Sequence, residues 1–125
     1  MATVVDASAV LAWLQDEPGS DIAERFLMEG VIGAANWSEV LQKSRQHGID
    51  PGTVTRLLAS FGLAVADVTA ADGEQAAVLW EPRTPRSLAD RLCLALALRR
   101  GDPVATTDGA WSQLASGPKV IVIGR

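Results

Sequence analysis

The stretch Thr3-Val4-Val5-Asp6-Ala7-Ser8-Ala9-Val10-Leu11 decides the fold, because it predicts a strand that passes straight into a helix. A β-branched run typical of a buried strand ends at Asp6, and small and apolar residues with helical spacing follow. In open α/β sheets, ligands and chemistry collect at the carboxyl ends of the strands. We therefore expect the Asp6 carboxylate at that edge of a sheet, within reach of a metal ion or a phosphate group.

Strand-like and helix-like segments alternate along the rest of the chain. Further strands are expected at 31–35, 63–68, 103–106 and 120–123, and helices at 7–14, 20–29, 36–47, 50–61, 70–80, 88–100 and 108–114. The linker-like segment 81–86 is short enough for a loop inside one domain. Because such alternation is typical of βαβ units, the sequence predicts a three-layer α/β/α fold with a parallel sheet, built as a single domain over residues 1–125.

The composition is that of a compact globular domain. The 125 residues are 48% hydrophobic, enough for one ordinary core, and no apolar run reaches the roughly 18 residues that a membrane helix needs. The N-terminus lacks the features of a signal peptide, and the single cysteine, Cys93, excludes an intramolecular disulfide. We therefore expect a cytoplasmic protein without a membrane anchor, in which Cys93 is a small buried hydrophobe.

The net charge of −4 argues against a protein that coats nucleic acid electrostatically. The remainder of the chain is neutral, however, once four acids are set aside: Asp6, Glu39, Asp90 and Asp108. Metal ions bound to these acids would remove the acidic bias locally. The charge is therefore compatible with a phosphodiester substrate.

Each of these acids has a simpler explanation as a helix cap. Asp6 and Asp108 precede helical segments and suit N-cap positions. The segments 36–39 and 87–90 have the spacing of a capping box, in which the acid reaches back to an unpaired backbone amide. The positive end of the helix macrodipole also favours a negative charge at all of these places. For any one acid taken alone, capping is the better explanation.

Taken together, the acids are harder to explain as caps. Asp6 and Asp108 directly follow strands, and Glu39 lies one helical turn beyond another strand. Asp90 lies in the first turn of a long apolar helix, and charged side chains are seldom buried unless they are paired or bind a metal. Oxygen ligands without a cluster of His or Cys suit a hard cation, Mg²⁺ or Mn²⁺.

Four segments in order resemble the PIN-domain ribonucleases, and among them the VapC-type toxins of toxin–antitoxin modules. The segments are Val4 to Ala9, Asn36 to Val40, Ser87 to Ala97, and Thr106 to Trp111. Each segment is a loose match by itself, whereas the four in this order are specific. The resemblance implies a parallel sheet with strand order 3-2-1-4-5, which brings three of the acids to one edge, with the helix that carries Asp90 closing the site.

The resemblance also implies an endoribonuclease that depends on Mg²⁺ or Mn²⁺. The catalytic, metal-binding acids of the family map onto Asp6, Glu39, Asp90 and Asp108. Ser8 and Thr106 match its supporting hydroxyl groups, for which local turn hydrogen bonds are the alternative. Some members carry a further Asp or Asn shortly after the last acid, where this chain has residues 109–112. The number of metal ions, one or two, therefore stays open.

Basic and aromatic residues near the acids have two interpretations each. Four basic side chains either contact the phosphates of RNA or simply lie on solvent-exposed helix faces: Lys43, Arg45, Arg86 and Arg91. The tryptophans occur in apolar helical patterns, so positions in the core or an interface, and not base stacking, are expected for Trp13, Trp37, Trp80 and Trp111. His47 is expected at a helix C-terminus, and the proposed chemistry does not require it as a general base.

For partners, the resemblance implies an RNA substrate, a small antitoxin that covers the site, and a homodimer. Exposed apolar surface on the early helices would suit antitoxin docking, at Leu14, Ile22, Phe26 and Leu27. A haloacid-dehalogenase-type phosphatase fits poorly because it requires an acid where this chain has Ser8, and a receiver domain requires a different arrangement of acids. The main alternative is a catalytically degenerate PIN domain that acts as an interaction module for protein or RNA, and the complete acid set argues against it.

Overall fold

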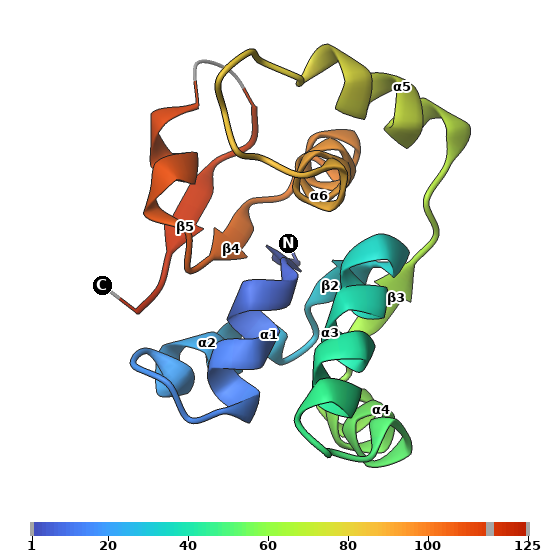
Figure 1. Ribbon diagram of the computed structural model, residues 1–125, viewed down its shortest axis with the longest axis vertical. Helices are drawn as coiled ribbons and strands as arrows, with labels where there is room; N and C mark the ends of the chain where they lie inside the picture. Colours follow the sequence, from blue (N-terminus) through green and yellow to red (C-terminus); the bar gives the residue numbers. More distant parts are fainter. Residues whose placement is uncertain (1, 115–116, 125) are drawn as a thin grey trace.

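A computed structural model, which describes residues 2–114 and 117–124, contains a five-stranded sheet between two layers of helices (Figure 1). The strands are β1 (Val4–Val5), β2 (Val31–Gly33), β3 (Ala64–Ala66), β4 (Val104–Thr106) and β5 (Val120–Val122). Their order is β3-β2-β1-β4-β5, and every neighbouring pair is parallel. The predicted three-layer class and the strand order 3-2-1-4-5 are confirmed.

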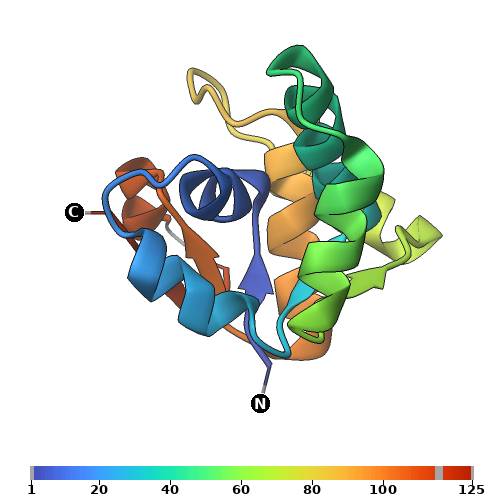
Figure 2. The ribbon, with the colours of Figure 1, turned by 90° about the horizontal axis from the view of Figure 1, so that it is seen from below.

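Helices cover both faces of the sheet. One layer consists of α1 (Ala7–Leu14), α2 (Ser20–Leu27), α3 (Ala34–Gln46) and α4 (Pro51–Ser60). The other consists of α5 (Ala70–Val78), α6 (Leu88–Arg100) and the short 3₁₀ helix η1 (Gly109–Gln113). Figure 2 shows β1 at the centre of the molecule, running directly into α1. None of the helices within the described ranges is long and apolar enough to cross a membrane.

Alternating side chains of the strands contribute to two separate cores. Val5 and Ile32 pack with the layer of α1 to α4, whereas Val4 and Val31 pack with α6 and with Trp111. The inner strands β1, β2 and β4 are buried on both faces, which is why their sequences are continuous apolar runs. Because β1 is the central strand, the residue that follows it emerges from the middle of the sheet edge.

The start of α3 differs from the prediction. The helix begins at Ala34 with Gly33 as its N-cap, so Asn36 lies inside the helix and forms no capping box with Glu39. The preceding strand β2 is correspondingly shorter than the predicted 31–35. A Cβ atom on Gly33 would lie 3.3 Å from both Asn36 Oδ1 and a methyl group of Leu96. A glycine at this point therefore allows α3 to start close beside α6.

The apolar surface expected on the early helices is largely absent. Leu27 is fully buried, and Leu14 and Phe26 are partly buried against the core, so of the four residues only Ile22 is exposed. The predicted exposure is therefore wrong for Leu27 and only partial for Leu14 and Phe26, which pack against the core. Exposed large apolar side chains instead include Val78, Trp80 and Leu88, in or next to the α5–α6 loop (residues 79–87).

Candidate active site

Asp6 lies at the carboxyl end of β1 and is the N-cap residue of α1. Its side chain is 5% exposed, and Oδ1 accepts hydrogen bonds from the Ser8 hydroxyl (2.7 Å) and the Ala9 amide (3.0 Å). The Thr106 hydroxyl donates to Oδ2 at 2.6 Å. Burial nevertheless raises the pKa of Asp6 to about 6, and the negative charge of Asp90 adds to the rise. A buried carboxylate in this condition is a candidate functional group.

Ser8 and Thr106 hold the Asp6 carboxylate and the end of β4 together. Besides donating to Asp6, the Thr106 hydroxyl accepts a hydrogen bond from the Asp108 amide at 3.1 Å, and the Ser8 hydroxyl accepts one from the Thr107 amide at 3.0 Å. The bond between Thr106 and Asp6 joins residues 100 positions apart. The two hydroxyl groups therefore make tertiary contacts, in addition to the local turn hydrogen bonds that were the alternative.

Asp90 lies in the first turn of α6 and forms a capping box with Ser87. The Asp90 amide donates to Ser87 Oγ, and the Ser87 amide donates to Asp90 Oδ2, both at 3.1 Å. The half-buried carboxylate raises the pKa of both Asp6 and Glu39, so it lies within electrostatic range of both. No residue in the described part of the chain donates a hydrogen bond to its other oxygen, Oδ1.

Glu39 is the one acid of the four that caps no helix. It lies half-buried on α3, and burial, followed by the charge of Asp90, raises its pKa, while Lys43 one turn along lowers it. Among residues 2–114 and 117–124, the Glu39 carboxylate has neither a hydrogen-bond donor nor an ion-pair partner. The capping explanation is therefore wrong for Glu39. None of the described contacts gives its half-buried charge a role in stabilising the fold.

Asp108 follows β4 at the same sheet edge but is exposed. It is the N-cap residue of η1, and its Oδ1 accepts a hydrogen bond from the Ala110 amide at 2.9 Å. Capping is thus confirmed for three of the acids, Asp6, Asp90 and Asp108. The described cap bonds use Oδ2 of Asp90 and Oδ1 of Asp108 and leave the second oxygen of each carboxylate without a donor among the described residues, so capping and a site role are compatible.

Asn36 is a buried residue near the site whose position the sequence pattern did not predict. Its Nδ2 donates to the Ala89 carbonyl at 3.2 Å and so joins the first turn of α3 to the first turn of α6. These are the helices that carry Glu39 and Asp90. Its position three residues before Glu39, on the same helix face, is the sequence signal that would have found it.

The carboxylates fit a hard divalent cation in the type of donor they offer. They present oxygen atoms only, and Mg²⁺ is commonly bound by one or two carboxylates together with water. No three His, Cys, Asp or Glu side chains of the described residues stand close enough to hold an ion together as they are. The Asp90 and Asp108 carboxylates are turned towards backbone amides, and Asp6 is the buried charge that a cation would stabilise.

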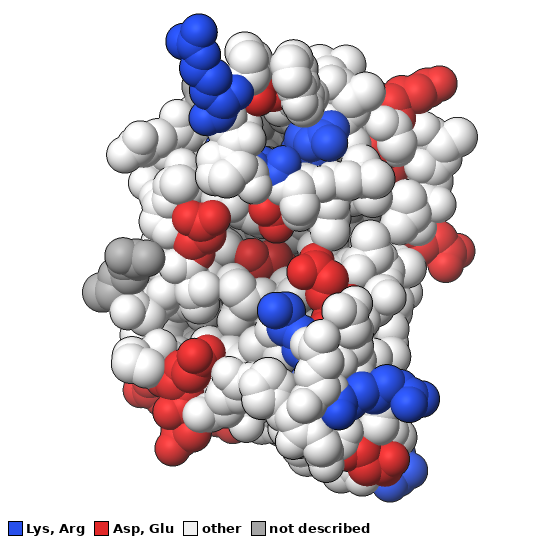
Figure 3. Space-filling view, viewed as in Figure 1, with Lys and Arg blue, Asp and Glu red and all other residues white. Residues whose placement is uncertain are grey.

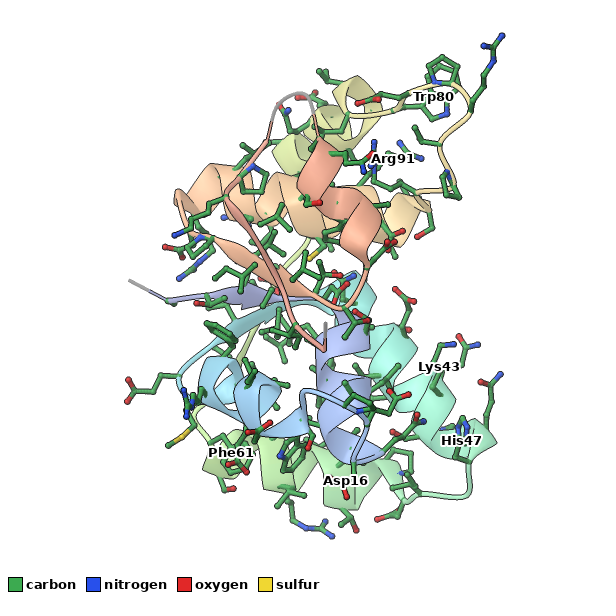
Figure 4. The ribbon with its side chains drawn as sticks, turned by 90° about the vertical axis from the view of Figure 1, so that its left-hand side faces the viewer. Asp16, Lys43, His47, Phe61, Trp80 and Arg91 are labelled. Carbon is green, nitrogen blue, oxygen red and sulfur yellow. The ribbon has the colours of Figure 1, made fainter. Side chains whose placement is uncertain are left out.

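Basic side chains surround the acids without neutralising them. Figure 3 shows acidic side chains in a hollow at the centre of one face, with basic side chains above and below it. The ion pairs within the described residues are Arg86–Glu81, Arg99–Asp72 and Arg100–Asp102, and they include none of the four acids. Figure 4 shows Lys43 and His47 on the outer side of α3 and Arg91 beneath the loop that carries Trp80.

The aromatic and histidine predictions have mixed outcomes. Trp111 is in the core and Trp13 and Trp37 are half-buried against it, as predicted. Trp80 is 60% exposed, so of its two predicted places the core is excluded and an interface stays a prediction. His47 lies at the C-terminus of α3, as predicted, with Nδ1 2.8 Å from the Lys43 carbonyl oxygen.

Comparisons with known proteins agree with this architecture. The family model of the PIN domain matches residues 3–117, whereas none of the curated protein sequences matches the chain. Among solved structures, a toxin–antitoxin complex from Klebsiella pneumoniae is similar over 97% of both chains, with a TM-score of 0.75 and 17% identity. VapC20 of Mycobacterium tuberculosis, a toxin that cleaves the sarcin–ricin loop, is similar over 91% of this chain and 95% of its own, with a TM-score of 0.73 and 17% identity.

A third similar structure is VapBC2 from Rickettsia felis bound to a DNA fragment from its promoter. It covers 98% of this chain and 99% of its own, with a TM-score of 0.71 and 14% identity. Likeness at such low identity shows a shared fold. Because the family model spans nearly the whole length as well, the chain belongs to the PIN domain family.

Proposed function

We propose that this protein, as a single domain over residues 1–125, is a metal-dependent endoribonuclease that acts as the toxin of a toxin–antitoxin pair. The observation that carries the proposal is that the charge of Asp90 adds to the raised pKa of both Asp6 and Glu39, so both acids lie within electrostatic range of Asp90. Three elements bring these acids together, and no basic residue in the described ranges forms an ion pair with them. Such an arrangement disfavours the folded state unless a cation binds there.

The proposed chemistry assigns each residue a task. Asp6, Glu39, Asp90 and Asp108 would hold Mg²⁺ or Mn²⁺, directly or through water. When bound, the metal supplies a water of lowered pKa and stabilises negative charge on the phosphoryl oxygens. Ser8 and Thr106 orient the Asp6 carboxylate through their hydroxyl groups. Asn36 keeps α3 against α6, so that Glu39 and Asp90 stay on one side of the site.

The proposed partners are an RNA substrate, a cognate antitoxin protein and a second copy of the chain, and the proposed location is the cytoplasm. The structures from Klebsiella and Rickettsia support the antitoxin because both are assemblies of a toxin with its antitoxin. VapC20 supports the substrate class because it cleaves an RNA loop. Metal ions at the acids would favour the approach of phosphate to a chain whose net charge is −4.

The experiment that tests this function is cleavage of a cellular RNA pool by the purified protein. Reactions contain Mg²⁺, Mn²⁺ or EDTA, with Asp90→Asn as the site variant and Asp72→Asn as the matched control. Asp72 occupies the same position in a capping box of α5, away from the acids. We expect cuts that require both metal and Asp90 but not Asp72. Cleavage by Asp90→Asn at the wild-type rate would contradict the proposal.

A second candidate function is a PIN domain without catalysis that acts as an interaction module. The observation in its favour is that no three acids of the described residues lie close enough together to hold one metal ion. Calorimetric titration with Mn²⁺ separates the two functions. Absence of both metal binding and RNA cleavage would leave Asp6, Asp90 and Asp108 as helix caps and favour the interaction module.

A further inference from the structure

We propose that Arg86 and Arg91 form a phosphate-binding site for the RNA chain next to the four acids. The inference rests on the proposed function and deepens it, because it names residues that bind the substrate outside the reacting group. Arg86 directly precedes Ser87, the N-cap residue of α6, and Arg91 directly follows Asp90. Both therefore lie at the junction of the α5–α6 loop with the helix that carries a proposed metal ligand.

Arg86 has a nearly buried side chain, Arg91 is half-buried, and both use few of their donors. The Arg86 side chain is 9% exposed, and its one ion pair, from Nη2 to the exposed Glu81 carboxylate, is long at 3.6 Å. Arg91 Nη1 donates to the Ala76 carbonyl oxygen at 2.8 Å. The Nε atoms of both residues are buried and have no hydrogen-bond partner among the described residues. Since arginine carries five N–H donors and a permanent charge, the described contacts leave most of this hydrogen-bonding capacity unused.

Arg99 shows what a purely structural arginine does in the same protein. Its Nε and Nη2 donate to the two oxygens of the Asp72 carboxylate at 2.8 and 3.1 Å. That pair joins α6 to α5 and satisfies the guanidinium group with the geometry that arginine prefers. Arg86 and Arg91 have no comparable carboxylate within the described residues, although each borders the segment that carries Asp90. Anchoring of the loop alone does not account for their buried Nε atoms.

Basic side chains lie near the acids on this face, but none forms an ion pair with the four acids within the described residues. Figure 3 shows basic side chains recessed in a hollow directly above the acidic one, and Figure 4 places Arg91 under the α5–α6 loop. Carboxylates and guanidinium groups that are neighbours without pairing suit a ligand that binds both. Such a ligand would contact the carboxylates through a metal ion and the guanidinium groups directly. RNA offers a phosphate at each nucleotide, so one phosphate can react at the acids while another binds the arginines.

The test is binding of a labelled single-stranded RNA in EDTA, where cleavage cannot occur, measured by fluorescence anisotropy over a range of salt concentrations. The variants are Arg86→Gln and Arg91→Gln. The control is Arg56→Gln, which removes an exposed charge on α4, at the opposite end of the molecule in Figure 1. We expect each site variant to bind about tenfold more weakly. The slope of log affinity against log salt should become shallower by about 0.7 for each phosphate that the variant no longer binds, and the control should match the wild type.

Two further measurements separate loss of binding from loss of folding or of function. Melting temperatures show whether the Gln variants are folded. Arg86→Lys and Arg91→Lys retain the positive charge, so they should lose less RNA affinity than the Gln variants. Unchanged RNA affinity and salt slope in the folded Gln variants would overturn the phosphate site. If the wild type still cleaves RNA in that case, the proposed function stands without the phosphate site. Unchanged RNA affinity together with weaker antitoxin binding would assign the arginines to a carboxylate of the protein partner and also overturn the site.

Failure of the proposed function has a different signature. A wild-type protein that cuts no RNA, but binds it through both arginines, would retain the phosphate site and lose the nuclease function. A wild-type protein that neither cuts nor binds RNA would overturn both.

Discussion

Helices α5 and α6 begin with the same motif in different surroundings. Thr69 and Asp72 form a capping box at the start of α5, and Ser87 and Asp90 form one at the start of α6. Both boxes have the same spacing and the same pair of reciprocal hydrogen bonds, 3.1 Å in each case. By local geometry alone the two aspartates are equivalent.

Their neighbours make them different. Asp72 is 3% exposed and bound by Arg99, and the hydrogen bonds from that guanidinium group are the main cause of its lowered pKa. Asp90 has no such cation in the described residues, and its charge raises the pKa of Asp6 and Glu39. A capping motif therefore identifies where a helix starts, whereas the charge that surrounds it indicates whether the acid is structural or belongs to a site.

The largest expected effect is on cleavage by Asp90→Asn. Because this change removes the charge of a proposed metal ligand but keeps an oxygen for the cap, we expect RNA cleavage to fall roughly 1000-fold, or about 4 kcal/mol of transition-state stabilisation. The folded state should remain, since the Ser87 amide still has an acceptor. Single-turnover cleavage rates and a thermal melt measure the two effects. A cleavage loss of the same size in Asp72→Asn would remove the distinction between the two boxes.

The pH dependence of stability should have opposite signs in the two regions. The pKa of Asp6 is raised from 3.8 to about 6, so without metal the folded state binds this proton more tightly than the unfolded state. The free energy of unfolding should therefore fall as the pH rises from about 4 to 6, by on the order of 3 kcal/mol. The lowered pKa of Asp72 acts in the other direction, and its contribution is lost as the pH falls below 4.

Urea denaturation in EDTA at pH 4 to 7 measures the decline due to Asp6, and points below pH 4 measure the loss due to Asp72. Asp6→Asn should remove the decline between pH 4 and 6, and Asp72→Asn should leave it in place. Added Mg²⁺ should also flatten the decline, because the metal competes with the proton for the same carboxylate. A wild-type slope in Asp6→Asn would show that the buried carboxylate does not control it.

Asp72→Asn should affect stability rather than catalysis. Loss of the charge on this buried side chain weakens its hydrogen bonds with Arg99, and we expect a cost of about 1–2 kcal/mol, seen as a melting temperature lower by several degrees. Cleavage per folded molecule should stay at the wild-type level. Arg99→Gln is the matching variant from the other side of the pair, and an undisturbed melting temperature in both variants would contradict the structural role of Asp72.

The smallest effect is expected for Ser8→Ala. The Ser8 hydroxyl donates one of the hydrogen bonds that orient Asp6, and the Thr106 hydroxyl and the Ala9 amide remain. We expect about tenfold slower cleavage and weaker Mn²⁺ binding, as for other residues that orient a metal ligand. Ser112→Ala, on the exposed side of η1, is the control. Equal rates in both variants would show that Thr106 and Ala9 are sufficient.

Elements with strong local signals could be predicted from the sequence. Helix α6 begins after Ser87 and ends before Gly101, as predicted, because a side chain caps its start and the left-handed glycine ends it. Helix α4 follows its Asp50 cap in the same way. The start of α3 could not be placed, since the helix begins where Gly33 lies close to Leu96 on a distant segment.

For the candidate site, the sheet-edge rule and the order of motifs identified the acids, and the structure adds their surroundings. That Glu39 caps nothing, that Asn36 bonds to Ala89 and that Arg86 is buried all depend on contacts between segments far apart in the sequence. Helical periodicity predicts a buried face but not which neighbour covers it. This is why Phe26 was expected to be exposed.

The hydrogen bond from Thr106 to Asp6 also bears on when the protein becomes active during its synthesis. The ribosome makes Asp6 100 residues before its partner in β4. Contacts between such distant residues form late in folding, after the chain between them is available. Under the proposed nuclease function, an unfinished nascent chain would hold Asp6 Oδ1 through Ser8 and Ala9 but would lack the hydrogen bond to Oδ2, so its site would be incomplete until residue 106 joins the sheet.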